Sequence, residues 1–466
     1  MKNTALLLAL AIISISVYAQ QKPSYTQLKQ YEGLYQYRFG DKIKFAASPK
    51  DTVLFAVINQ SRYLLKPLAA DVFTDQSGDH IVFLRNASNL IDRYTVDKDT
   101  FRLISNKIIF GKEMWYPKLV ADVNKYQYHY RQPQKTGDGL PTSTAVNAGL
   151  DTALLDNMVN KIVRGDYPNV HSVLVIKGGK LVFEEYFYEF TRDSVQELRS
   201  ASKSFVSALI GIAIDKGIIK SKHEPVVSFF PEYKLANYTD AKGRITIENL
   251  LSNQTGIDYD ISNGKAAGNE VAMGNTDDWV KYTLDLPMID TPGGKGMYAS
   301  GNPVTAGKII EKASGMPLHD FAKKYLFDPM GIKNFKWNFG PNKSNAEDFC
   351  QVYLTPREMA KFGLTYLNGG QWNGRQVVPR QWVDESLTKH SIVQGVDYGY
   401  LWWLKYLDAD GTRYYGKAAQ GNGGQKIYLF AAQDLVVVVT GGNYNAKTPS
   451  DELIRKYILP SFNKKQ

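Results

Sequence analysis

A predominantly apolar segment, residues 206–214, constrains the fold of this chain more than any other feature. It follows the polar stretch 198–205 directly and is stopped by Gly217, a pattern typical of a single helix. A helix that is apolar on nearly every face is stable only inside a core. The sequence therefore predicts a buried helix with Ser200 and Lys203 at its amino-terminal end, where the backbone dipoles are positive.

Ser200 and Lys203 have the spacing of a nucleophile and its base. Residues three apart share a face of a helix, so the Lys203 amine can lie beside the Ser200 hydroxyl. A serine hydroxyl needs such a base, and burial near positive dipole ends can make a lysine suitable for that role. The alternative is structural: Ser200 caps the helix and Lys203 is solvated. Two later motifs favour the catalytic interpretation.

The amino terminus has the features of a secretory signal peptide. Lys2 precedes an apolar run over residues 5–17, and Ala19 ends a typical cleavage site, so we expect residues 1–19 to be removed. The run is too short to cross a bilayer, and no later segment reaches the roughly 18 apolar residues of a membrane helix. No cysteine follows the expected cut, which argues against lipid attachment there. These features predict a periplasmic or secreted protein without a transmembrane segment.

Composition and charge narrow the classes of function. The 466 residues are 44% hydrophobic and 12% aromatic, which is typical of a globular protein of two domains. The six histidines are scattered, and the single cysteine, Cys350, is expected to be a small buried residue, so we expect no metal site and no cofactor. The formal charge of +10 is spread along the chain and is interpreted as a contribution to solubility. No motif supports binding to nucleic acid.

The pattern of strands and helices divides the chain. Short alternating apolar runs separated by Gly, Asp and Asn predict a small β-rich domain over residues 20–121. A polar stretch with Pro and Gly, residues 122–147, is predicted to be a linker. Residues 148–466 begin with a helix and a hairpin, continue with helical patterns and return to strands. We therefore predict an α+β domain whose antiparallel sheet pairs its two ends.

A second motif lies in a glycine-rich turn before a predicted helix at residues 304–313. This turn displays Tyr298 where its side chain can face a cleft, and a phenol beside an ammonium group can relay a proton. Ser300 or Asn302 would then hydrogen-bond Lys203. On its own, however, such a segment is more typical of an ordinary loop.

A third motif comes directly before a strand near the carboxyl terminus. It consists of Asn422, Gly423, Gly424 and Gln425. Glycine lets a backbone come close to a bound ligand because it has no side chain in the way. The amide of Gln425 would then point, together with the amide of Ser200, at a developing oxyanion. The alternative for this motif is a β-bulge or a tight turn.

In order, the three motifs resemble the signature motifs of the penicillin-recognising serine hydrolases: Ser200-x-x-Lys203, Tyr298-x-Ser300 and Asn422-Gly423-Gly424. Further segments are similar to class C β-lactamase-like proteins, namely residues 245–256, 354–363, 367–374 and 398–403. The resemblance covers about residues 150–460 and is strongest to esterases and to amide hydrolases related to 6-aminohexanoate-dimer hydrolase. It implies an α+β fold in which helices flank an antiparallel sheet and form an all-helical subdomain, preceded here by a small all-β domain.

The third motif departs from the pattern of the family. β-Lactamases and penicillin-binding proteins usually carry Lys-Thr-Gly there, and the hydrolase relatives often carry His-x-Gly, whereas this chain has Asn422-Gly423-Gly424. A substrate carboxylate would lack its cationic partner, so we expect esters or amides rather than penicillins as substrates. Ser300 stands where class C β-lactamases have Asn, and Asn302 is the candidate to compensate. The amino-terminal domain resembles lipocalin-like accessory domains, for which a packing role is the simpler interpretation.

Together the motifs imply an acyl-enzyme mechanism on a small-molecule ester, an amide or a peptide. Lys203 would take the proton of Ser200, and the amides of Ser200 and Gln425 would hold the oxyanion. Tyr298 would relay a proton to the leaving group, and Asn422 would orient the substrate or the phenol. Two alternatives stay open. One is a D-amino-acid peptidase or β-lactamase acting on cell-wall-like peptides, and the other is a sensor or binding protein without turnover.

Overall fold

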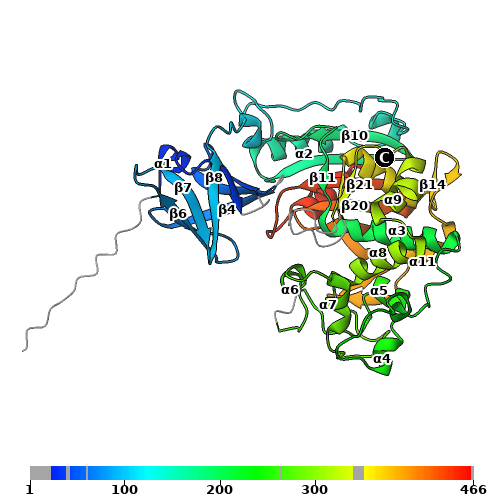
Figure 1. The fold of residues 1–466 in the computed structure, drawn as a ribbon. Helices are drawn as coiled ribbons and strands as arrows, with labels where there is room; N and C mark the ends of the chain where they lie inside the picture. The colour runs from blue at the N-terminus through cyan, green and yellow to red at the C-terminus, as the bar shows by residue number, and fades with distance from the viewer. Residues whose placement is uncertain (1–21, 38–41, 59–60, 262–264, 339–350, 463–466) are drawn as a thin grey trace, which may run out of the picture. The chain divides into compact units, whose positions relative to one another are not determined.

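The computed structural model describes residues 22–37, 42–58, 61–261, 265–338 and 351–462. The chain forms two compact units, the first made mainly of residues up to 108 and the second mainly of residues 109–466 (Figure 1). The predicted signal peptide and Cys350 lie outside the described residues. In the described ranges, no helix combines the length and the apolar character that crossing a membrane requires.

The first unit is a closed barrel of eight strands with one short helix, α1 (Tyr25–Lys29). The strands follow in chain order and β8 pairs back with β1: β1 (Gly33–Tyr37), β2 (Lys42–Ser48), β3 (Val53–Ile58), β4 (Ser61–Ala69), β5 (Val72–Thr74), β6 (His80–Arg85), β7 (Ile91–Val96) and β8 (Asp99–Ser105). Its interior is aromatic, with edge-to-face contacts of Tyr35 and Tyr94 with Phe45. The structure thus confirms the predicted small all-β domain. It also shows that the strands close into a barrel, which the sequence analysis did not predict.

The second unit is built on an antiparallel sheet of eight strands in the order β10-β9-β21-β20-β19-β18-β17-β16. The bounds are β9 (Val170–Lys177), β10 (Lys180–Tyr186), β16 (Ser391–Val393), β17 (Val396–Tyr398), β18 (Trp403–Ala409), β19 (Thr412–Gly421), β20 (Gln425–Phe430) and β21 (Leu435–Gly441). β9, near the start of this unit, pairs with β21, near its end, with Leu174 opposite Val438. This pairing confirms the predicted sheet that joins the two ends of the domain.

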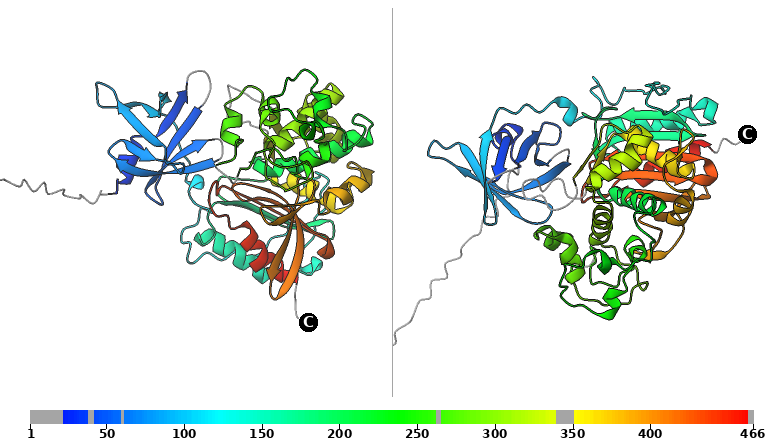
Figure 2. Two further views of the ribbon diagram at one scale, coloured as in Figure 1. Left: turned by 90° about the horizontal axis from the view of Figure 1, so that it is seen from below. Right: turned by 45° about the vertical axis from the view of Figure 1, so that its right-hand side comes forward.

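Helices cover both faces of the sheet. On one face, α10 (Pro356–Leu367) packs on β9, β20 and β21. On the other face, α2 (Thr152–Arg164) lies beside the carboxy-terminal helical segment that follows α12 (Ser450–Leu453), as the left view of Figure 2 shows. The predicted buried helix is α3 (Ser202–Asp215), and 11 of its 14 residues are buried. Gly217, with φ of +66°, follows its end.

A mainly helical region is inserted between β11 (Gln196–Glu197) and β13 (Gln351–Leu354). It comprises α4 (Asp240–Gly243), α5 (Ile247–Leu251), α6 (Glu270–Gly274), α7 (Trp279–Asp285), α8 (Gly301–Ser314) and α9 (Leu318–Ala322). Within it α8 packs against α3, α5 and α7. These contacts place the turn that precedes α8 close to the start of α3.

The segment predicted to be a linker runs along the second unit. Tyr128 and Leu140 are buried in the core of that unit. The Tyr128 hydroxyl donates to Glu185 Oε1 at 2.6 Å, and its amide donates to Asn160 Oδ1 at 2.8 Å. Tyrosines in this polar stretch therefore attach it to β10 and α2.

Candidate active site

Ser200 lies in a short 3₁₀ turn, η3 (Arg199–Ala201), that leads directly into α3. The residue before it, Arg199, has φ of +49°, in the left-handed region that non-glycine residues rarely adopt. Such a conformation persists only where other contacts hold it. Arg199 Nε lies 2.7 Å from Glu197 Oε1, and its guanidinium carbon lies 4.8 Å from the centroid of the Tyr444 ring. These contacts support the turn that presents a half-buried Ser200 at the start of α3.

Lys203 Nζ donates a hydrogen bond to Ser200 Oγ at 2.9 Å. Lys203 lies in the first turn of α3 and is also half-buried. The same ammonium lies 5.3 Å from the centroid of the Tyr298 ring, within the range of a cation–π contact. The structure thus brings together three residues that the sequence analysis singled out, from two segments about 100 residues apart.

Tyr298 is held by aromatic neighbours in the turn that precedes α8. Only 7% of the residue is exposed. Its ring lies 5.4 Å from the ring of Trp403 on β18 and packs edge-on against Tyr398 on β17, with centroids 6.5 Å apart. The turn also fits tightly against β16, because a Cβ at Gly296 would lie 2.4 Å from the Ile392 carbonyl oxygen. Contacts with three strands therefore fix the orientation of the phenol ring.

Asn253 holds this turn through three hydrogen bonds. Its carbonyl oxygen accepts from the amide of Met297 at 2.9 Å. Its side-chain Oδ1 accepts from the amide of Ala299 at 3.4 Å and from Asn302 Nδ2 at 2.8 Å. The backbone of Asn253 is left-handed, with φ of +58°, a conformation that Asn adopts more readily than most residues. Both neighbours of Tyr298 in the chain are therefore bonded to Asn253.

We expect Asn253→Gly to lower kcat by about 10- to 100-fold with little change in KM, because a small misplacement of a catalytic group is enough for such a loss. Glycine keeps the left-handed backbone, so the change removes the side chain and its bonds to Ala299 and Asn302 without altering the main chain. Steady-state kinetics on an ester substrate measure the effect. The control is Asn237→Gly, since Asn237 has φ of +52° and bonds Asp285 in the same unit. If Asn253→Gly lowered kcat no more than Asn237→Gly does, the positioning role would be contradicted.

Three polar residues of the predicted site have hydrogen-bond partners other than Lys203. The Ser300 hydroxyl donates to Glu270 on α6, and Asn302 donates to Asn253. Asn422 Nδ2 donates to Asn445 Oδ1 at 2.7 Å, and Asn422 Oδ1 accepts from the Asn445 amide at 3.0 Å. In the described part of the chain, neither Ser300 nor Asn302 makes the bond to Lys203 that we expected. The turn into α8 directs these side chains toward the helical region instead.

The third motif forms the turn between β19 and β20, next to Ser200. Gly421 pairs with Gln425 across the hairpin, and Gly423 and Gly424 have φ of +89° and +105°. A Cβ at Gly421 would lie 2.2 Å from the Leu198 carbonyl oxygen, so only glycine lets this strand lie against the Ser200 turn. The motif is thus a tight turn, as the alternative interpretation expected, and the approach of its backbone to a bound ligand stays a prediction.

The side chain of Gln425 is bound within the sheet. It is fully buried, and its Nε2 donates to the Gly441 carbonyl oxygen at 2.5 Å. The main-chain amide of Gln425, and not its side chain, is therefore the candidate donor to an oxyanion. In the described ranges, no group of three or more His, Cys, Asp or Glu residues is arranged to hold a metal ion.

Sequence reasoning missed Asn253 and Glu270. The signal for Asn253 was present, since Asn253 and Gly256 are typical turn residues between two predicted elements. Nothing in the sequence indicated Glu270, because its contact with Ser300 spans 30 residues and depends on how α6 and α8 are arranged.

Comparisons with known proteins identify the family of the second unit. A family model described as Beta-lactamase matches residues 156–457. The chain is 25% identical over 293 residues to 6-aminohexanoate-dimer hydrolase of Paenarthrobacter ureafaciens, covering 57% of this chain and 70% of that protein. It is 26% identical over 194 residues to lovastatin esterase of Penicillium rubens, covering 38% of this chain and 48% of that protein.

Among solved structures, a penicillin-binding protein homologue from Caulobacter crescentus has the same fold. The TM-score is 0.53 at 14% identity, with 69% of this chain and 99% of that chain covered. At this identity the likeness shows the fold alone.

Proposed function

Because the chain belongs to the β-lactamase family of serine hydrolases, we propose that it cleaves an ester or linear amide bond through an acyl-enzyme on Ser200. The observation that carries this proposal is the 2.9 Å hydrogen bond between Lys203 Nζ and Ser200 Oγ, with the Tyr298 ring over the same ammonium. A helix cap needs only a hydroxyl. A nucleophile needs a base in contact with it and a group that can carry a proton to the leaving atom.

In the first step, Lys203 takes the proton of Ser200 while Oγ attacks the carbonyl carbon of the substrate. The 2.9 Å contact is within the range required for direct proton transfer. The main-chain amides of Ser200 and Gln425 hold the tetrahedral oxyanion, a stabilisation on the order of 3 kcal/mol per donor. The close approach of Gly421 to the Ser200 turn supports this assignment, since it brings the end of β19 next to the nucleophile.

In the second step, Tyr298 passes a proton to the leaving alcohol or amine as the C–O or C–N bond breaks and receives in its place the proton that Lys203 took from Ser200, which leaves the acyl group on Ser200. The same groups then act in reverse: water attacks the acyl carbon, and one of its protons passes through Tyr298 and Lys203 to Ser200 Oγ as the bond between Oγ and the acyl carbon breaks. This releases the carboxylic acid and returns Ser200 to its free form. We assign to Asn422, held by Asn445, the orientation of the substrate.

The third motif supports esters and linear amides over penicillins. Asn422-Gly423-Gly424 offers no cationic side chain for a carboxylate, and the polar atoms of Asn422 are bonded to Asn445. Two relatives are named for hydrolysis of a linear amide dimer and of an ester. The signal peptide predicted from residues 1–19 would place this activity in the periplasm or outside the cell.

The test compares three substrates on the purified protein: p-nitrophenyl butyrate, a small linear anilide and nitrocefin. We expect measurable kcat/KM for the ester or the anilide and a value at least about 100-fold lower for nitrocefin, since a lost charge partner is worth a few kcal/mol. Faster turnover of nitrocefin would favour the peptidase or β-lactamase alternative. An acyl adduct that forms without product release would favour the sensor.

A further inference from the structure

A cavity of about 820 Å³ lies beside α10. Its walls come from residues 136–139, residues 328–334, the first turns of α10 and the hairpin of β14 (Gln371–Trp372) and β15 (Arg375–Gln376). Of the described residues that line it, none belongs to the Ser200 site. The volume is in the range of sites that take small organic molecules.

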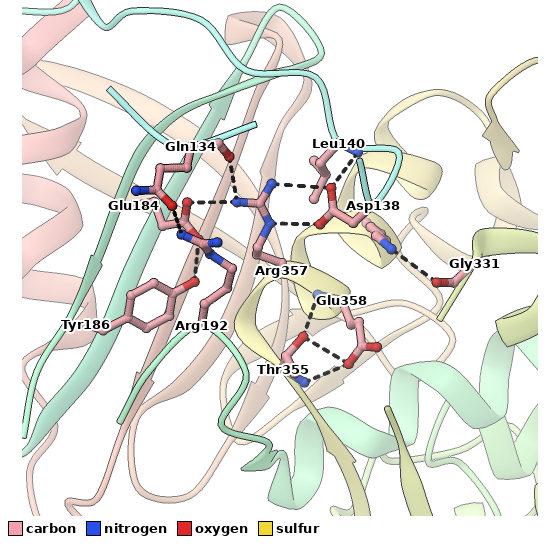
Figure 3. Close-up of polar contacts among 11 residues, drawn as sticks. Gln134, Asp138, Leu140, Glu184, Tyr186, Arg192, Gly331, Thr355, Arg357 and Glu358 are labelled. Atoms are coloured by element: carbon pink, nitrogen blue, oxygen red, sulfur yellow. Dashed lines mark hydrogen bonds and ion pairs between the residues drawn. The ribbon is translucent and has the colours of Figure 1, made fainter. Parts of the chain in front are cut away.

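Arg357, a buried cation in this wall, is fully occupied by protein groups (Figure 3). Its Nε and one terminal nitrogen donate to the two carboxylate oxygens of Asp138, at 2.8 and 3.3 Å. The other terminal nitrogen donates to Glu184 Oε2 at 2.8 Å and to the Gln134 carbonyl oxygen at 3.4 Å. Arg357 therefore ties three segments together and has little left to offer a ligand.

The carboxylates near the cavity are also engaged. Glu358 Oε2 accepts from the amide and the hydroxyl of Thr355, each at 2.9 Å, in the capping box of α10. Its Oε1 accepts from the amide of Asn334 at 3.2 Å. Asp138 accepts from Arg357 and from the amide of Leu140 at 3.1 Å (Figure 3). Neither of these two carboxylates forms a hydrogen bond with Lys361, the buried lysine that also lines the cavity.

That lysine, Lys361, is 3% exposed, and its ammonium has a single hydrogen-bond acceptor among the described residues, the Gly331 carbonyl oxygen at 3.3 Å. Lys242 gives an internal comparison. It is fully buried as well, but its ammonium donates to three carbonyl oxygens, those of Ala236, Leu284 and Leu286, at 3.2, 2.7 and 2.7 Å. An ammonium carries three donors. Lys242 uses all of them inside the protein, whereas Lys361 uses one and lines the cavity.

Charges of both signs line the cavity around Lys361: the carboxylates are those of Asp138, Asp193, Asp328 and Glu358, and the other cations are those of Arg192, Lys333, Arg357 and Arg375. Burial lowers the pKa of Lys361, the carboxylates of Asp138 and Glu358 oppose this, and Arg357 and Lys333 lower it further. Lys333 and Arg375 also line the cavity, and neither forms an ion pair within the described residues. An anion on Lys361 would therefore have two further cations near it, Lys333 and Arg375, that are not paired with a carboxylate in the described residues, although Asp193 and Asp328 also line the cavity.

We propose that this cavity binds a small organic carboxylate, with its anionic oxygens on Lys361 and its apolar part against Trp372. The Trp372 ring lines the cavity, and its centroid lies 5.9 Å from Lys361 Nζ, so one molecule of a few ångströms reaches both. Lys333 and Arg375 complete the anion site at its rim. This proposal does not depend on the hydrolase activity proposed for Ser200.

The test is isothermal titration calorimetry on the full chain with benzoate as the probe and benzamide as its uncharged counterpart. We expect benzoate to bind and benzamide to bind at least tenfold more weakly. Lys361→Met should weaken benzoate binding at least tenfold, and Arg375→Ala should weaken it a fewfold. The Ser200→Ala variant should bind benzoate as the natural chain does. Quenching of tryptophan fluorescence by benzoate should disappear in Trp372→Phe.

Several outcomes would overturn the proposal. The first is equal binding of benzoate and benzamide, and the second is benzoate binding that Lys361→Met leaves unchanged. The third is benzoate binding that Ser200→Ala removes. The fourth is a chain that binds neither benzoate nor inorganic phosphate at 20 mM. Urea denaturation provides the check on folding. Lys361→Met should keep its midpoint because it removes an underpaired charge, whereas Lys242→Met should lose stability because three carbonyl groups lose their donor. If Lys361→Met failed to fold, Lys361 would be a structural lysine. In that case, benzoate binding that Arg375→Ala leaves unchanged would overturn the proposal.

Discussion

Ser200→Ala should abolish hydrolysis of whichever ester or amide the protein turns over, with kcat/KM reduced by a factor of about 10⁴ or more, as for removal of other serine nucleophiles. The physical reason is that no other hydroxyl is placed 2.9 Å from Lys203 Nζ in the described chain. Alanine removes one oxygen from a half-buried turn, so we expect the fold to be kept. Initial rates on p-nitrophenyl butyrate and circular dichroism of both proteins measure the two effects.

Ser204→Ala is the matched control for this prediction. Ser204 lies in α3, directly after the turn that holds Ser200; it is buried and donates to the Leu401 carbonyl oxygen at 2.7 Å, so it is a structural serine. Its loss should reduce stability by about 1 kcal/mol and leave turnover within a fewfold of the natural chain. Turnover by Ser200→Ala similar to that of this control would remove Ser200 from the mechanism.

Lys203→Met should lower kcat by about 10² to 10⁴, the usual contribution of a general base, because Ser200 Oγ would then have no group to take its proton. Methionine has nearly the same length and keeps the contact with the ring of Tyr298. Lys203→Arg should not restore activity, since a guanidinium stays protonated and cannot accept a proton. Stopped-flow measurement of the acylation burst separates this step from deacylation.

The arginine variant distinguishes two roles for Lys203. If the residue served only as a positive charge near the substrate, Lys203→Arg would keep most of the activity. An arginine variant with more than about a tenth of the natural rate would therefore contradict the base assignment, since one factor of ten is only 1.4 kcal/mol. Lys216→Met, at the exposed end of α3, is the control and should have no effect.

The parts of this structure that follow from local periodicity were predictable. Residues 206–214 are apolar on nearly every face, which predicted a buried helix, and the 3₁₀ turn η3 that leads into this helix places Lys203 beside Ser200, three residues earlier. Val173 and Val437 belong to apolar runs at opposite ends of the domain, which predicted a sheet shared by both ends.

Features that depend on contacts distant in sequence were not predictable. Alternation along β1 and β8 identifies two strands, but it does not say that Tyr35 pairs with Leu103 and closes a barrel. The bonds of Ser300 to Glu270 and of Asn302 to Asn253 depend in the same way on the packing of short helices. The glycines of the third motif indicated a turn correctly, because a left-handed backbone is a local requirement.

Intact-mass spectrometry on acid-quenched samples detects the acyl-enzyme on Ser200 itself. The protein is mixed with p-nitrophenyl butyrate, quenched during turnover, weighed and digested, with Ser200→Ala treated in parallel. We expect one added butyryl group on the peptide that contains Ser200 in the natural chain and none in the variant. An adduct that persists in Ser200→Ala, or that maps to another residue, would contradict this expectation.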